Sequence, residues 1–163
     1  MSLAQDVTPH PDGHNSSEDV AELPFDQSLI YVVIAVVAAG MATGGAYAKF
    51  RDSYPVMEYA IVATIAITAF IHLFVGLEGD LLLILNGLGY IALASVRFLP
   101  QLQQKMPLNI LNGATIIYTI ITIIGYFVVH GGVETVGLIT KAIELALIAL
   151  IFVNIRQSQA NPA

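Results

Sequence analysis

A lysine and a glutamate stand three residues apart in the last long apolar stretch of the chain, residues 133–155. A charged side chain in the middle of a bilayer costs at least about 2.5 kcal/mol. In a helix, this spacing puts Lys141 and Glu144 on one face, where they can pair. One interpretation is structural: a buried ion pair, or a neutral Glu144 hydrogen-bonded to Asn or Tyr of neighbouring segments. The other is a protonatable site on a proton or ion path, and contacts with a partner subunit or cofactor are a third.

Two histidines suggest a different chemistry. His72 lies about four residues inside the end of the segment 55–75, and His130 ends the segment 108–130. Two histidines at similar depth on different helices are the arrangement needed for axial ligation of a b-type haem. The simpler interpretation is a hydrogen-bonded His72 in the core and an interfacial His130.

Acidic residues beside His130 suggest a metal site. His130 and Glu134 are four residues apart, and Glu78 and Asp80 fall on the same side of the membrane if the segments alternate in direction. Imidazole and carboxylate ligands suit zinc or copper. The amino-terminal tail adds His10 and His14. Because the spacing matches no strong metal motif, absence of any cofactor remains the first expectation.

Further polar residues recur at helical spacing inside the apolar segments. Because lipid-facing positions should be apolar, these residues indicate the interior of a bundle. We expect a polar interior of His72, Asn86, Tyr90, Asn112, Lys141 and Glu144. A stripe of residues three or four apart runs along the segment 108–130: Asn112, Thr115, Thr119, Thr122 and Tyr126.

Small residues recur every four positions in the first apolar segment, at Gly40, Gly44 and Ala48. Such a ridge allows close approach of another helix. We expect it to pack on the rest of the bundle, and the alternative is an interface with a second subunit.

Five apolar segments form the framework for these residues. Of the 163 residues, 56% are hydrophobic and 11% are charged, against about 25% charged in soluble domains. Segments of about 20 residues span the roughly 30 Å hydrocarbon core as helices. The sequence therefore predicts an all-α, multi-pass bundle of five transmembrane helices in the cell membrane, within residues 27–156. The predicted spans are 27–48, 55–75, 80–99, 108–130 and 133–155.

Charges at the ends of the spans and in the connections between them predict the orientation. If the helices alternate, Lys49, Arg51, Arg97, Lys105 and Arg156 fall on one side, and the acidic tail, Glu78, Asp80 and Glu134 on the other. The positive-inside rule then places the amino terminus outside and the carboxyl terminus in the cytoplasm. Residues 1–26 are expected to be a disordered extracytoplasmic tail, and 157–163 a short cytoplasmic tail.

Several classes of protein are disfavoured. The chain has no cysteine, which excludes disulfides, thiolate ligands and thiol catalysis. It has no G-x-S-x-G or H-E-x-x-H motif and no phosphate-binding glycine loop. Six scattered basic residues and a net charge of −6 argue against nucleic acid as a partner. Enzyme activity is thus disfavoured without being excluded.

Short motifs within residues 60–155 resemble those of small, uncharacterised archaeal membrane proteins of the haloarchaeal type. They are Ile71-His72-Leu73 with Gly76, the run from Leu85 to Tyr90, and Lys141-Ala142-Ile143-Glu144. The resemblance implies a four-helix core and no activity that carries over.

A small chain with short loops is typical of an accessory or structural subunit of a larger membrane complex. We therefore expect a non-catalytic membrane protein whose partners are lipid and other membrane subunits or itself. The alternative is proton or ion handling, or haem or metal binding, by Glu144 and Lys141 or by His72 and His130.

Overall fold

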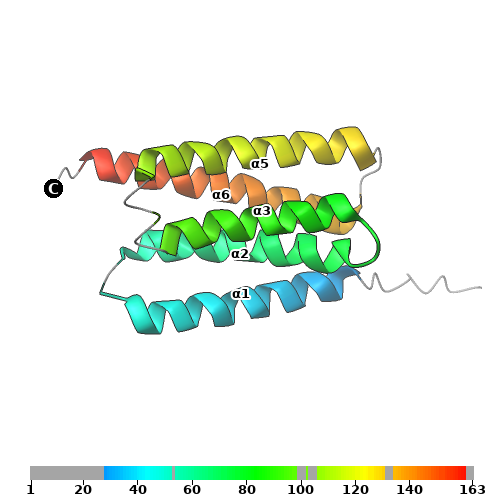
Figure 1. Ribbon diagram of the computed structural model, residues 1–163, viewed down its shortest axis with the longest axis horizontal. Helices are drawn as coiled ribbons and strands as arrows, with labels where there is room; N and C mark the ends of the chain where they lie inside the picture. The colour runs from blue at the N-terminus through cyan, green and yellow to red at the C-terminus, as the bar shows by residue number, and fades with distance from the viewer. Residues whose placement is uncertain (1–27, 53, 99–101, 103–105, 131–133, 161–163) are drawn as a thin grey trace, which may run out of the picture.

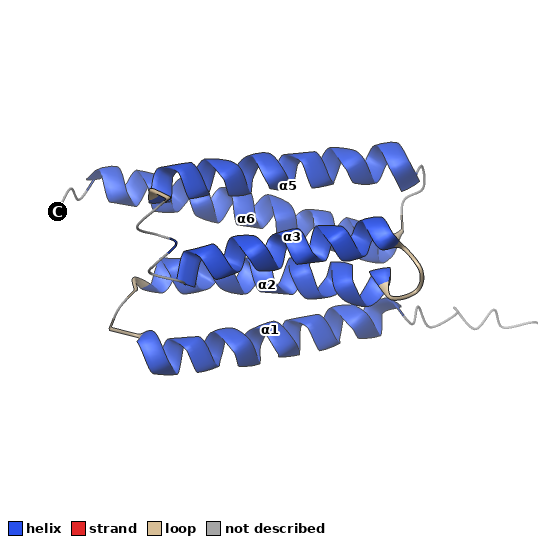
Figure 2. Ribbon diagram, in the orientation of Figure 1, coloured by secondary structure: helices blue, strands red, loops and turns tan. Residues whose placement is uncertain are grey.

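The computed structural model describes residues 28–52, 54–98, 102, 106–130 and 134–160, and these residues form helices and short connections without strands (Figures 1 and 2). Five long helices lie side by side, with neighbours in sequence running in opposite directions. They are α1 (Ser28–Phe50), α2 (Val56–Gly76), α3 (Leu81–Phe98), α5 (Leu108–His130) and α6 (Thr135–Ala160).

All five helices are long and apolar enough to cross a membrane, which confirms the predicted number of spans. Their bounds agree with the predicted ones to within two residues except at the end of α6, which continues to Ala160. A helix need not end where its apolar residues end, and the Ser158 hydroxyl donates to the Asn154 carbonyl in this last part (3.0 Å). Residues 157–160 are therefore helical, whereas the predicted tail of residues 1–26 lies outside the described residues.

The turn between α2 and α3 has a clear local cause. The Asp80 amide donates to the Gly76 carbonyl (2.9 Å), and Gly79 between them has φ +120°, which favours glycine. The Asp80 carboxylate then accepts from the amides of Leu82 (2.8 Å) and Leu83 (3.2 Å). Asp80 is thus the amino-terminal cap of α3, and the turn fixes α2 and α3 as an antiparallel hairpin.

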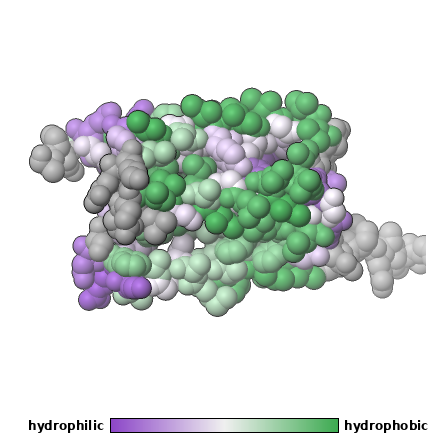
Figure 3. All heavy atoms as spheres, in the orientation of Figure 1, coloured by the Kyte–Doolittle hydropathy of each residue, from purple (hydrophilic) through white to green (hydrophobic). Residues whose placement is uncertain are grey.

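The bundle is apolar outside and contains polar groups inside. Large apolar side chains of every helix are exposed, and Figure 3 shows the apolar surface along the bundle with the most polar residues near its ends. α2 packs against α1, α3 and α6. The largest buried apolar cluster consists of Ile61, Ile65, Ala69, Tyr90, Leu147 and Ile151. This distribution suits a bundle whose central surface faces the hydrocarbon of a bilayer.

The predicted packing of the glycine ridge is wrong within this chain. Gly40, Gly44 and Ala48 are exposed, and a Cβ atom added at either glycine would have no neighbour within 4 Å. α1 is instead buried at Ala35 and Ala39, which are 0% exposed. One residue rotates a helix by about 100°, so the ridge that begins at Gly40 faces away from the bundle. Its alternative role as an interface with a second subunit remains a prediction.

Two glycines provide a matched test of this packing. A Cβ atom at Gly87 would lie 2.7 Å from Leu73 Cγ and 2.9 Å from the Ala69 carbonyl oxygen, so α2 and α3 would have to separate. We expect Gly87→Ala to destabilise the protein by about 1–3 kcal/mol. Gly40→Ala should stabilise it by about 0.5–1 kcal/mol, since it only removes helix flexibility. Unfolding in mixed detergent measures both, and a destabilising Gly40→Ala would show that α1 is packed differently.

Candidate functional site

Glu144 of α6 is the centre of a buried polar group, here called the Glu144 cluster: His72, Tyr90, Thr122, Lys141 and Glu144. The Glu144 side chain is 0% exposed. Lys141 Nζ donates to its Oε2 at 2.6 Å, so the i,i+3 spacing makes an ion pair. The Tyr90 hydroxyl of α3 donates to Oε1 at 3.2 Å, and His72 Nε2 of α2 lies 3.6 Å from the same oxygen. One carboxylate thus faces a cation, a phenol and an imidazole.

The orientation of the His72 ring follows from its second contact. His72 Nδ1 lies 2.8 Å from the Thr68 carbonyl oxygen, one turn earlier in α2. A carbonyl oxygen only accepts, so Nδ1 must carry a hydrogen. Nε2, which points toward Glu144, then carries a lone pair in the neutral ring or a hydrogen in the protonated ring. His72 can therefore gain or lose a proton at Nε2, which faces the carboxylate, while Nδ1 keeps its hydrogen bond to the Thr68 carbonyl.

α5 holds the cluster from its remaining side. The Thr122 hydroxyl is 3.0 Å from the Tyr90 hydroxyl, and the Thr122 carbonyl is 3.5 Å from Lys141 Nζ. The Tyr118 ring packs edge-on against Tyr90, with centroids 5.0 Å apart, and its hydroxyl donates to the Asn86 carbonyl (3.1 Å). Residues from α2, α3, α5 and α6 therefore position one carboxylate.

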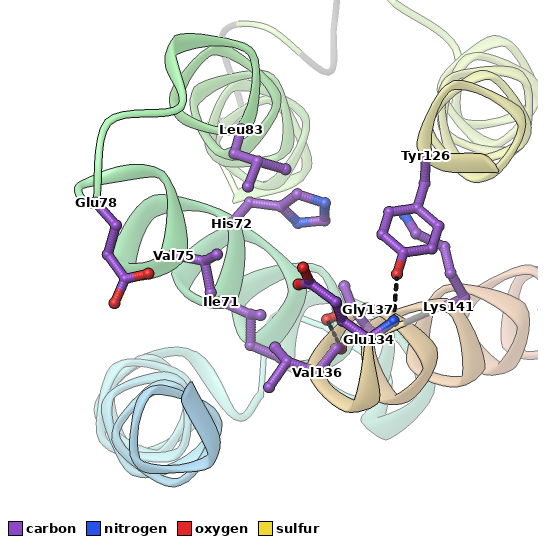
Figure 4. Close-up of a pocket in the computed structure, with 11 residues that line it drawn as sticks. Ile71, His72, Val75, Glu78, Leu83, Tyr126, Glu134, Val136, Gly137 and Lys141 are labelled. Atoms are coloured by element: carbon purple, nitrogen blue, oxygen red, sulfur yellow. Dashed lines mark hydrogen bonds between the residues drawn. The ribbon is translucent and has the colours of Figure 1, made fainter. Parts of the chain in front are cut away.

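Two cavities border this cluster on the side toward the acidic end of the bundle, which is defined by Glu78, Asp80 and Glu134. One is about 90 Å³, lies between α2 and α6, and has Glu78 and Glu134 in its walls. The other is about 200 Å³ and lies between α3 and α5. His72 and Lys141 line both cavities. Figure 4 shows His72 pointing across the first cavity toward Tyr126 and Lys141. Both cavities are large enough for water, and both have polar groups to bind it.

A second buried group lies toward the opposite end, and it was not among the sites predicted from the sequence. This Glu58 cluster consists of Glu58, Arg97, Asn112 and Asn154. Arg97 donates through Nη1 to Glu58 Oε2 (2.7 Å) and through Nη2 to Asn112 Oδ1. Asn154 Nδ2 donates to Glu58 Oε1 (2.8 Å). The cluster ties together α2, α3, α5 and α6, and a cavity of about 360 Å³ reaches Glu58 and Asn154.

The sequence did hold a signal for this second cluster. Arg97 falls within the predicted span 80–99 and was counted only as an orienting charge beside the following loop, but it lies in the last turn of α3 and is 1% exposed. Glu58 lies in the first turn of α2. In antiparallel neighbours, the first turn of one helix and the last turn of the next lie at the same depth. Opposite charges at that depth predict an ion pair.

The predicted polar interior is divided between two places in the structure, and five of its six residues are buried, Asn86 being half-buried. His72, Tyr90, Lys141 and Glu144 do come together. Asn112 is buried as predicted, but it belongs to the Glu58 cluster and precedes Thr122 in α5 by ten residues, a distance of about 15 Å along the helix. Asn86 lines the 200 Å³ cavity, and its Oδ1 is buried without a hydrogen-bond partner among the described residues. A water or a ligand donor in that cavity would satisfy it.

The structure gives the haem hypothesis no support. His72 is buried, with one ring nitrogen at the Thr68 carbonyl and the other facing Glu144. An axial ligand would have to turn one of these nitrogens toward iron. The side chain of His130 lies outside the described part of the chain, although α5 ends at that residue.

The predicted zinc or copper site is not formed by the residues that the structure describes, which contain no group of three or more His, Asp or Glu able to hold a metal ion. Asp80 is engaged as the cap of α3. Glu78 and Glu134 instead line the 90 Å³ cavity, where the Glu134 amide donates to the Tyr126 hydroxyl (3.3 Å). His10, His14 and the His130 side chain are outside the described residues.

The fold and both clusters define a class: an all-helical protein with five membrane-length helices and buried charged groups between four of them. Comparison with protein-family models, curated proteins and solved structures found no match to this chain. The resemblance to small archaeal membrane proteins therefore remains a prediction, and the arguments for function come from the site itself.

Proposed function

We propose that this protein is a membrane protein that binds and transfers protons at the Glu144 cluster. The observation that carries the proposal is the contact of His72 Nε2 with Glu144 Oε1 at 3.6 Å, beside cavities that reach both His72 and Lys141 from one end. Imidazole and carboxylate are the common groups of proton relays inside membranes. Water in the cavities would bring protons to His72, and His72 would exchange them with Glu144.

Charge balance favours protons over metal cations as the species bound. Lys141 lies 2.6 Å from the Glu144 carboxylate and already offsets its charge. A metal ion would need several oxygen or nitrogen ligands, whereas this oxygen pair already faces Lys141, Tyr90 and His72. A proton needs one lone pair at a time, which this arrangement offers.

The orientation proposed for the protein follows the charges at the two ends. Lys49, Arg51 and Arg156 lie at the end opposite Glu78, Asp80 and Glu134 (Figure 1). By the positive-inside rule, the acidic end with its two cavities faces outward and the carboxyl-terminal end faces the cytoplasm. Arg97 contributes less to this argument than the sequence suggested, because it pairs with Glu58 inside the bundle. In this orientation the Glu144 cluster takes its protons from the outside.

Glu144→Gln tests the proposal, because it removes the protonatable group but keeps its shape and its hydrogen-bonding oxygen. Purified protein in lipid vesicles is exposed to a pH step, and infrared difference spectra record the carboxyl stretching band. We expect a carboxyl signal that Glu144→Gln removes and that Asp52→Asn, at an exposed position, retains. If Glu144→Gln leaves the spectrum unchanged while the protein stays folded, the carboxyl of Glu144 does not exchange protons.

The second candidate is the accessory subunit of a larger membrane complex, and the exposed face of α1 favours it. Gly40 and Gly44 lie on that face, where a Cβ atom added at either would meet none of the described residues within 4 Å, and small residues allow close helix contact. The mass of the protein extracted in mild detergent tests this role. Co-purifying subunits that Gly40→Leu releases would support it, and a monodisperse monomer would contradict it.

A further inference from the structure

The Glu58 cluster has the same elements as the Glu144 cluster at the opposite end of the bundle. Each has one buried carboxylate, one buried cation, and polar side chains from other helices. Each also borders a cavity. His72 and Lys141 line the cavity at the acidic end, and Glu58 and Asn154 line the cavity at the other end. The Glu58 cavity is further lined by Tyr54 and Ser158. This second cavity would let water reach the Glu58 carboxylate from its own end of the bundle.

A polar line on α5 joins the two clusters. Asn112 belongs to the Glu58 cluster and Thr122 to the Glu144 cluster. Between them, Thr115 and Thr119 are both 0% exposed and point into the bundle. Their hydroxyls donate to the Leu111 and Thr115 carbonyls (2.8 Å each), which leaves oxygen lone pairs that can accept from water. The line covers about 15 Å, a few water molecules in length.

Apolar side chains lie between the two ends in the static structure. Ile61, Ile65, Leu147 and Ile151 pack as one core at the level between the clusters. The cavities described above lie at the two ends and none of them spans this core. A proton would cross this level only when water enters beside Thr115 and Thr119, so the core limits leakage between the two ends.

We propose that Glu58 is the second proton-binding carboxylate of one transmembrane route, which runs from the Glu144 cluster along Thr119 and Thr115 to the Glu58 cluster. This inference rests on the proposed function of Glu144. A proton leaves Glu144, passes along transient water at the α5 stripe, binds a Glu58 carboxylate oxygen, and departs through the cavity beside Asn154. Arg97 and Lys141 keep their charges throughout, and both carboxylates return to their starting state. The only net change is one proton moved between the two solutions.

The experiment compares proton flux and carboxyl protonation on the same preparations. Purified protein in lipid vesicles is given a pH gradient with a potassium ionophore to balance charge, and a trapped dye records flux. We expect Glu58→Gln to lower the flux about tenfold or more, equal to a barrier increase of about 1.4 kcal/mol. The infrared carboxyl signal of Glu144 should persist in this variant. Glu144→Gln should lower the flux and remove that signal.

A pair of threonine variants tests the connecting stripe without touching either carboxylate. Thr119→Val removes a hydroxyl on the proposed route and nearly keeps the shape of the side chain, so we expect slower flux. Thr64→Val is the matched control, because the Thr64 hydroxyl of α2 also donates to the carbonyl four residues earlier (2.8 Å) but lies off the stripe. Its flux should equal that of the unmodified protein.

The outcomes separate this inference from the proposed function. A Glu144 carboxyl signal with no flux, or with flux that Glu58→Gln and Thr119→Val leave unchanged, would overturn the route and leave the proton site standing. Absence of any Glu144 signal would overturn the proposed function and the route with it. Loss of flux in both carboxylate variants and in Thr119→Val, with Thr64→Val unaffected, would support both.

Discussion

Replacing Arg97 by leucine is expected to destabilise the bundle by about 3 kcal/mol. The substitution leaves Glu58, which is 7% exposed, without its cation, and Asn154 as its remaining donor from another helix. It also removes the donor to Asn112, so this cluster no longer links α3 to α2 and α5. Unfolding in mixed detergent followed by circular dichroism measures the effect. The size of the loss reflects an uncompensated buried charge more than the strength of the ion pair itself.

A double variant shows which of these two causes applies. Arg97→Leu combined with Glu58→Leu removes both charges, and it should recover much of the loss, because an apolar pair avoids the cost of burying ions. Arg51→Leu is the control, since its side chain is 68% exposed. A single Arg97→Leu variant as stable as the unmodified protein would show that Glu58 finds water or another partner, so that the cluster does not hold the helices together.

Lys141→Met is expected to have an effect of similar size at the other cluster. It keeps most of the length of the side chain but removes the ammonium 2.6 Å from the fully buried Glu144 carboxylate. Tyr90 and His72 would remain near the carboxylate without offsetting its charge in the same way. We expect a loss of about 3 kcal/mol in the free energy of unfolding.

The compensating variant again identifies the cause. Lys141→Met with Glu144→Gln removes the charge that the single variant leaves unpaired, and its stability should return close to that of Glu144→Gln alone. Lys49→Met, at an exposed position near the end of α1, serves as the control. Equal losses in the single and double variants would mean that Lys141 acts through its other contacts, for example the placement of its ammonium over the Tyr126 ring (5.4 Å to the ring centroid), rather than through its pair with Glu144.

The helices themselves were predictable because each needs only a long apolar run between polar or proline-containing connections. The pairing of Lys141 with Glu144 was one of the alternatives left open, since both lie within one helix at a fixed spacing. Contacts between helices depend on rotation and depth, which a single segment does not define. For this reason Asn112 was predicted to be buried but was assigned to the wrong neighbours.

The two main errors concern residues whose type permits more than one role. In α1, the residues that pack are alanines, and the adjacent glycines that seemed better suited to packing face outward. Asp80 suited a metal site by type, but an aspartate just before a helix also suits a cap, and the structure shows the cap. In both cases residue type permitted two roles, and only the three-dimensional arrangement distinguishes them.

The short turn at Gly79 has a consequence for how the protein is made. Glu58 and Arg97 are 39 residues apart. At a synthesis rate of about 5–20 residues per second, Arg97 is therefore added roughly 2–8 s after Glu58. Entering the membrane alone, α2 would carry an unpaired charge. Insertion of α2 and α3 together, as one hairpin leaving the translocon, would bring the two charges into the lipid already paired. The ribosome would then have to add Asn154, 96 residues after Glu58, before the carboxylate gains its last partner.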